Sequence, residues 1–300
     1  MQSANAASAG SPKRPSSLQQ RVTSSVVLVL VVLIVVWWNF WSLVIGLAIV
    51  AVVAISELYS AFQRGGYPMQ RWLGIPLTLV PILAAVGEAY WHRSLIAPVC
   101  SIGIVVSLIA QLPWHTQTGM LARWGLSVAG AYYVGLLISV YVLLRALDTP
   151  LGASPLRQLG PDPGAAWIFF VLLATWGQDV LAYFAGRLFG RHLMTPTLSP
   201  KKTWEGAAGG VLGSIVAAWF GVYLFGLPLA PLWIIIIGTI AGVVGPLGDL
   251  SESMIKRQAG IKDAGDLIPG HGGMLDRIDS MLFTGPVIGY LLLLLLPFMI

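Results

Sequence analysis

The chain has 300 residues, of which 57% are hydrophobic and only 10% are charged, and its mean hydropathy is +0.82. Soluble globular domains carry about 25% charged residues, so this composition excludes a soluble fold and indicates a chain that resides in lipid. The formal net charge of +5 says less than the position of the charges along the chain, and no nucleic-acid partner is expected.

The apolar residues form long blocks, and about 20 consecutive apolar residues make a helix long enough to cross a bilayer. Residues 1–24 are rich in Ala, Ser, Gly and Pro and are predicted to form a disordered cytoplasmic tail. A signal peptide is not expected, because no small-residue cleavage site follows the first apolar run. Nine spans are predicted, at about 22–38, 41–62, 73–90, 95–112, 124–144, 165–184, 206–225, 232–250 and 281–300. The sequence therefore predicts an all-α polytopic membrane protein.

A loop rich in Pro and Gly, residues 149–164, divides these spans into two groups. About five spans are expected in an N-terminal region, residues 25–164, and about four in a C-terminal region, residues 165–300. The single cysteine, Cys100, lies in the fourth span, where one thiol forms neither an internal disulfide nor a thiolate metal cluster. We interpret it as a packed structural thiol.

The basic residues predict the orientation of the spans. With a cytoplasmic N-terminus, 14 of the 17 Lys and Arg residues fall in cytoplasmic segments, and only Arg93, Arg145 and Arg157 fall in outer loops. This is the bias expected of a multi-span protein. It predicts a cytoplasmic N-terminus and a C-terminus outside, and it places two large polar stretches, residues 186–205 and 249–280, in the cytoplasm. We expect a multi-pass protein of the cell inner (plasma) membrane with its active site on the cytoplasmic side.

The second polar stretch begins at the end of the eighth predicted span. If that helix continues past Asp249, then Asp249, Ser253 and Lys256 recur at i, i+4 and i+7 and share one face. A carboxylate and a hydroxyl are hard oxygen ligands for a metal ion, and an ammonium binds phosphate oxygens. This face therefore suits a metal-bound phosphate.

The same stretch ends where the ninth span should begin. Asp276 and Asp279 lie there at i, i+3 around Arg277, just after the glycine-rich run of residues 270–273. A helix N-terminus favours anions, and Mg²⁺ usually takes one or two protein carboxylates together with substrate phosphates. A solvated loop with capping carboxylates is the alternative for any single residue. His271 is either a base or metal ligand or, as we favour, a polar loop residue that orients a neighbour.

The second polar stretch also resembles the signature of a known family. The run from Ser253 to Asp279 resembles the signature of the phosphatidate cytidylyltransferase family, S-x-x-K-R-x4-K-D-x5-[PG]-x-H-G-G-x-x-D-R-x-D. Its fixed positions are filled here by Ser253, Lys256, Arg257, Lys262, Asp263, Pro269, His271, Gly272, Gly273, Asp276, Arg277 and Asp279. The preceding Gly248 and Asp249 fit the family's lead-in.

The first polar stretch follows Asp179, which lies inside the sixth predicted span. An ionisable residue within the membrane is costly and is a functional hypothesis by default, although pairing with Arg187 or Lys201 is the structural alternative. Lys201 and Lys202 come just before the seventh span, where they either bind a phosphate or anchor the span at the interface. The run Ser199-Pro-Lys-Lys-Thr-Trp-Glu-Gly resembles the same family, which favours a substrate-phosphate role.

The resemblance implies transfer of a cytidylyl group from CTP to phosphatidate, giving CDP-diacylglycerol and pyrophosphate with Mg²⁺, and a second cation is left open. It also implies a homodimer, for which no motif argues. Catalytic roles are predicted for Asp249, Asp276, Lys256 and Arg277. Metal binding is predicted for Asp249, Asp276, Asp279 and Ser253. Substrate binding is predicted for Asp179, Ser199, Lys201, Lys202, Ser253, Arg257, Lys262, His271, Gly272 and Gly273.

Two other functions remain open at this point. One is a cytidylyltransferase for another lipid phosphate, such as an isoprenoid-ether lipid. The other is an ion-coupled transporter that uses the intramembrane acids Glu57, Glu88 and Asp179. No inverted repeat supports the transporter, and it leaves the polar cluster of residues 249–279 unexplained. Glu57 and Glu88 are assigned no role.

Overall fold

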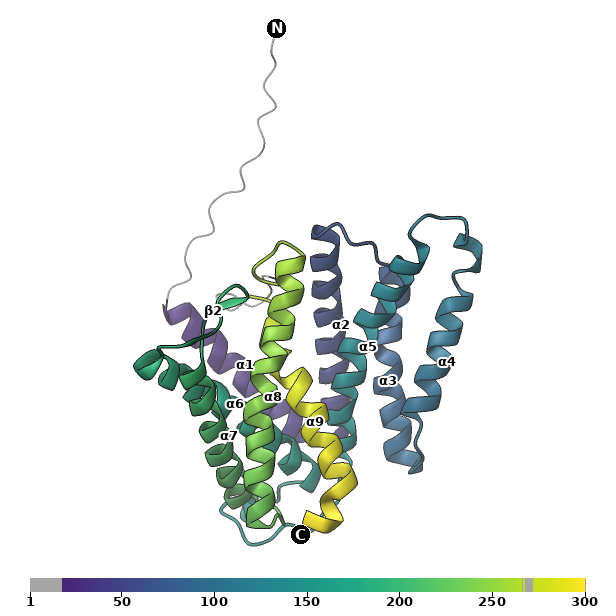
Figure 1. Cartoon of the computed structure of the whole chain (residues 1–300). Helices are drawn as coiled ribbons and strands as arrows, with labels where there is room; N and C mark the ends of the chain where they lie inside the picture. The colour runs from purple at the N-terminus through teal and green to yellow at the C-terminus, as the bar shows by residue number, and fades with distance from the viewer. Residues whose placement is uncertain (1–17, 266, 268–271, 300) are drawn as a thin grey trace.

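The computed structural model describes residues 18–265, 267 and 272–299, and it is built almost entirely of helices (Figure 1). The helices are α1 Leu18–Trp38, α2 Phe40–Arg64, α3 Arg71–Trp91, α4 Ile96–Ile109, α5 Met120–Arg145, α6 Pro163–Phe189, α7 Trp204–Phe225, α8 Pro231–Gln258 and α9 Leu275–Met299. Two short 3-10 helices, η1 Leu112–Trp114 and η2 Arg157–Leu159, lie in the connections.

Within the described part of the chain, eight helical segments are long and apolar enough to cross a membrane. The helix α4 counts among them together with η1, as Ile96–Trp114. The apolar part of α1, Val22–Trp38, is shorter. The prediction of an all-α polytopic membrane protein is confirmed. About nine spans were expected, and the described residues form nine α-helices, of which α1 is not among the eight candidate spans.

A small antiparallel hairpin was not predicted, and its strands are β1 Leu193–Thr195 and β2 Ser199–Thr203. These strands have three and five residues and lack the alternation of polar and apolar residues by which a half-buried strand is recognised. The largest differences from the predicted boundaries are at α8, which continues to Gln258, and at α9, which begins at Leu275. Both shifts bring predicted site residues onto helices.

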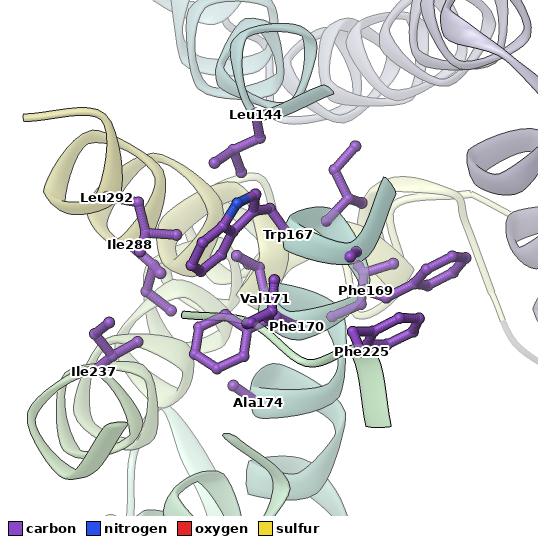
Figure 2. Close-up of a cluster of buried hydrophobic side chains, with 14 of the residues drawn as sticks. Leu144, Trp167, Phe169, Phe170, Val171, Ala174, Phe225, Ile237, Ile288 and Leu292 are labelled. Carbon is purple, nitrogen blue, oxygen red and sulfur yellow. The ribbon is translucent and has the colours of Figure 1, made fainter. Parts of the chain in front are cut away.

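The N-terminal half of α6 forms the centre of the hydrophobic core (Figure 2). Trp167 and Phe170 are fully buried, and the indole Nε1 of Trp167 donates to Thr149 Oγ1 at 2.8 Å. Figure 2 shows Leu144 of α5 and Leu292 of α9 directed at this helix from different sides. Helices from both halves of the sequence therefore bury their apolar faces in one core.

Glycines let α6 and α7 approach closely along their length. A Cβ atom added to Gly213 of α7 would lie 2.3 Å from the backbone oxygen of Gly177 in α6, and one added to Gly209 would lie 2.3 Å from Ala185 Cβ. Small residues at such spacing allow helix backbones in membranes to pack against each other. The two helices therefore form one wall that carries the hairpin at its end.

The polar elements gather at one end of the bundle (Figure 1). The hairpin, the end of α2 and the segment after α8 lie at that end, whereas α9 finishes at the opposite end. There the backbone N–H of Ala230, at the start of α8, donates to Met299 O at the end of α9 at 2.8 Å. The arrangement brings the two polar stretches of the sequence into one region.

Candidate active site

The extended α8 carries the first group of site residues. Because the helix does not end until Gln258, Asp249, Ser253 and Lys256 lie on one of its faces, as the spacing predicted. Ser253 Oγ donates to Asp249 Oδ1 at 3.3 Å. A carboxylate and a hydroxyl oxygen are therefore held side by side.

The hairpin that carries Lys201 and Lys202 is shaped by its own sequence. Thr203 caps α7, since its Oγ1 accepts from Gly206 N at 3.1 Å. Glu205 accepts from the backbone N–H groups of Arg191 and His192 at 3.1 and 3.2 Å and pairs with His192 Nδ1 at 2.6 Å. Thr203 and Glu205 thus fix the open end of the hairpin, where it joins α6 and α7.

Lys202 connects the two polar stretches. Its Nζ lies 2.8 Å from Asp249 Oδ2 and donates to the backbone oxygen of Pro246 at 3.1 Å. The ammonium of the hairpin therefore reaches the carboxylate of α8 across 47 residues of sequence. Neither motif alone shows this contact, because it joins separate elements.

A cavity of about 590 Å³ lies between α6, the hairpin, α7 and α8. Its walls contain the predicted residues Asp179, Ser199, Lys201, Lys202 and Asp249. Its remaining lining residues are Gln178, Ala182, Tyr183, Gly186, Arg187, Met194, Thr203, Gly206, Ala207 and Pro246. Ligand pockets have volumes of about 300–1,000 Å³, so this cavity has the size of a small-molecule site.

Asp179 is exposed to this cavity from α6. The charges that act on its carboxyl include those of Asp249, Asp279, Lys202 and Arg277. Lys202 and Arg277 are thus cations whose charges act on Asp179, and Arg187 and Lys201, which were considered as structural partners, line the same cavity. Arg187 instead donates to the hydroxyl of Tyr183 at 2.8 Å.

A second, more buried cluster lies where α8 ends and α9 begins. Lys256 Nζ lies 3.1 Å from Glu252 Oε2 and 2.6 Å from Asp276 Oδ1. The other oxygen of Asp276 accepts from Ala264 N at 3.1 Å and from Gly273 N at 2.8 Å. The carboxylate of Asp276 therefore links Ala264 and Gly273, two residues of the connection between α8 and α9.

The predicted metal ligands do not form one compact carboxylate cluster. Among the described residues, no three Asp, Glu, His or Cys side chains gather as they do in an all-protein metal site. Asp249 and Ser253 are together, Asp276 is engaged with Lys256, and Asp279 accepts from Ser280 N at 2.6 Å.

The other predicted residues are placed as follows. Arg257 is exposed and donates to Ile261 O at 3.3 Å, and Lys262 is exposed as well. Gly272 has a φ of +83°, a backbone conformation that side chains disfavour. His271 lies outside the described residues.

Two residues next to the site, Glu252 and Glu57, were not predicted to belong to it. Glu252 lies four residues before Lys256, a spacing that indicates pairing on a helix and could have revealed it. Glu57 accepts from the backbone N–H groups of Met274 and Leu275 at 3.0 and 2.8 Å, and no local spacing indicates a contact across more than 200 residues.

Glu88, the other glutamate left unassigned, accepts from the backbone N–H groups of Leu95 and Ile96 at 2.9 and 3.3 Å. It therefore caps the start of α4, far along the chain from both polar stretches.

Comparison with known proteins supplies the family. The model of the cytidylyltransferase family matches residues 19–295. The chain belongs to the cytidylyltransferase family. The match extends over the N-terminal helices, beyond the C-terminal half in which the motifs are found.

Three relatives have the same name, phosphatidate cytidylyltransferase. The chain is 32% identical to the one from Synechocystis sp. over 291 residues, which cover 93% of this chain and 97% of the relative. It is 34% identical to the one from Mycobacterium bovis over 265 residues, 84% of this chain and 81% of the relative. It is 31% identical to the one from Brucella abortus over 273 residues, which cover 89% of this chain and 90% of the relative. As a member of the cytidylyltransferase family, the protein is a nucleotidyltransferase, and the family supports CDP-diacylglycerol synthesis.

Proposed function

We propose that this protein transfers the cytidylyl group of CTP to phosphatidate in a Mg²⁺-dependent reaction that releases pyrophosphate. The cavity that joins the two polar stretches carries the proposal, because it places Lys201, Lys202 and Asp249 around one space of ligand size. The family and the names of the relatives support CTP and phosphatidate as substrates.

The reaction forms one P–O bond and breaks another. A phosphate oxygen of phosphatidate attacks the α-phosphorus of CTP, and the bond from that phosphorus to the β-phosphate bridging oxygen breaks, so that pyrophosphate leaves with the electron pair. Phosphatidate is anionic near neutral pH and its attacking oxygen needs no strong base. Catalysis then rests on positioning and on neutralising charge.

The residues of the cavity suit these two tasks. Lys201 and Lys202 from the hairpin line the same cavity as Asp179 and Asp249, so the cavity contains both cationic and acidic groups. We assign phosphate binding to the lysines, with Arg277 as a further cation near Asp179. Lys202 would then exchange its contact with Asp249 for one with a phosphate oxygen.

The donor set fits a Mg²⁺ ion that takes few protein ligands. Asp249 and Ser253 offer two hard oxygen donors 3.3 Å apart, and Mg²⁺ usually completes its shell with substrate phosphates and water. Asp276 lies in the separate cluster with Lys256, so a cation that it binds would be a second one. Its oxygens accept from Lys256, Ala264 and Gly273, and a carboxylate has about four lone-pair sites, so these contacts leave room for a cation. When bound, the ion would neutralise phosphate charge.

The proposal is tested with purified protein in detergent, supplied with CTP and phosphatidate with and without Mg²⁺. We expect equal amounts of CDP-diacylglycerol and pyrophosphate with Mg²⁺, and none after chelation. A parallel assay with an isoprenoid-ether phosphatidate separates the alternative lipid substrate. If no pyrophosphate appears with either lipid, the proposed reaction is wrong.

We also propose that the active site faces the cytoplasm of the cell inner membrane, with the N-terminus inside and the C-terminus outside. The support is that 14 of the 17 Lys and Arg residues fall in the segments predicted to be cytoplasmic. CTP added to sealed inside-out vesicles should be used, whereas CTP added to right-side-out vesicles should not. A homodimer stays a prediction that cross-linking in native membranes would test.

A further inference from the structure

Helix α2, which carries none of the predicted site residues, contacts the segment that holds Asp276. Glu57, near the end of α2, accepts from Met274 N through Oε1 at 3.0 Å and from Leu275 N through Oε2 at 2.8 Å. Leu275 is the first residue of α9. These N–H groups are among the donors that a helix leaves without internal partners, and a carboxylate there also interacts favourably with the helix dipole.

The backbone around Glu57 is shaped to admit this carboxylate. A Cβ atom added to Gly265 would lie 2.5 Å from Glu57 Oε1, and one added to Gly273 would lie 2.5 Å from Glu57 Oε2. The absence of a side chain at Gly265 and Gly273 therefore lets both backbone positions lie close to the Glu57 carboxylate. A side chain at either position would push Glu57 away from α9.

A second contact from α2 holds the same segment at another point. Arg64 Nη2 donates to Ala264 O at 2.9 Å, and the N–H of Ala264 donates in turn to Asp276 Oδ2 at 3.1 Å. The helix α2 thus contacts both Ala264, whose N–H binds the Asp276 carboxylate, and the backbone immediately before Asp276. Asp276 then presents its other oxygen to Lys256.

We propose that Glu57 is a positioning residue of the active site, which holds the start of α9 so that Asp276 stays in register with Lys256. The inference rests on the proposed cytidylyl transfer for its activity readout. Through Glu57 the N-terminal half of the chain supports the active site indirectly. Glu57 contacts Met274 and Leu275, which do not line the cavity.

The test replaces Glu57 by glutamine, which keeps the size of the side chain and removes its charge. The amide nitrogen would face one of the two backbone N–H groups, so a donor would meet a donor and one hydrogen bond would be lost. The matched control is Glu88→Gln, because Glu88 also accepts from two consecutive N–H groups at a helix start but lies at α4.

We expect Glu57→Gln to lower kcat about 10- to 100-fold, as displaced supporting residues do, and Glu88→Gln to leave it within about twofold of the wild type. The KM for CTP should change less than kcat in Glu57→Gln, because the cavity that holds Lys201 and Lys202 is left intact. A wild-type kcat in Glu57→Gln, or an equal loss in Glu88→Gln, overturns the inference.

Hydrogen exchange gives a readout that needs no activity. The amides of residues 273–276 should exchange about tenfold faster or more in Glu57→Gln and unchanged in Glu88→Gln. Unchanged exchange in Glu57→Gln also overturns the inference. If Glu57→Gln does not fold, Arg64→Met at an exposed position carries the same test through Ala264. A wild-type protein without pyrophosphate release would refute the proposed reaction, while the exchange data still decide the positioning contact.

Discussion

The pair of contacts made by Lys256 leads to a quantitative prediction for Lys256→Met. The side chain of Glu252 has no exposed surface, and those of Lys256 and Asp276 are 12% and 7% exposed. Among the described residues, Glu252 Oε1 has no hydrogen-bond partner, so Lys256 is the cation on which this carboxylate depends. Removing the ammonium leaves the carboxyl groups of Glu252 and Asp276 without their shared cation in a nearly dry site.

Breaking a buried ion pair by removing one partner costs about 3–5 kcal/mol, because the remaining charge stays buried. We expect Lys256→Met to lose that much free energy of unfolding. Adding Glu252→Gln replaces the buried Glu252 carboxyl by a neutral amide and should recover about 1–3 kcal/mol, since Asp276 keeps two backbone donors. The double variant should therefore be more stable than Lys256→Met alone.

The measurement is equilibrium unfolding by SDS in mixed micelles, followed by the fluorescence of the 12 tryptophans. Lys262→Met is the control, because this lysine is exposed and its loss should change stability by no more than about 0.5 kcal/mol. Lys256→Met within about 1 kcal/mol of the wild type would refute the reasoning. So would a double variant that is no more stable than Lys256→Met.

Two further predictions concern single positions. Gly213→Ala should destabilise the protein by about 1–3 kcal/mol, because its Cβ would lie 2.3 Å from Gly177 O, whereas Gly125→Ala, which meets no atom within 4 Å, should be neutral or stabilising by up to about 1 kcal/mol. Equal effects in the SDS titration would contradict the close packing of α6 and α7. Asp276→Asn should lower kcat by about 100-fold or more while the protein remains folded, and a turnover like that of the wild type would remove Asp276 from the catalytic groups.

The sequence predicted what depends on local order. Hydropathy identified the helices, and the seven-residue interval from Asp249 to Lys256 placed both on one face of α8, because a helix fixes side-chain directions by residue number alone. The motif also located Asp276 near the start of α9. These inferences need only the geometry of a single helix.

The contacts between elements were beyond the sequence. Lys202 meets Asp249 and Glu57 meets Leu275 because α2, α8 and the hairpin end, and α9 begins, in the same region. The spacing of residues along the chain does not show that arrangement. For the same reason, the basic residues around Asp179 could not be identified from its neighbours in the sequence. Arg187 is near Asp179 in sequence, but its side chain donates to Tyr183.

The two ends of the α8–α9 pair have a mechanical consequence. Ala230 N and Met299 O join these helices at one end, and Lys256 and Asp276 join them at the other. A pair of helices joined at both ends resists separation. The helices α6 and α7 pack against this pair, and Lys202 of the hairpin adds a salt bridge to Asp249 where the two walls of the cavity meet. An anionic ligand in the cavity would compete with Asp249 for that ammonium.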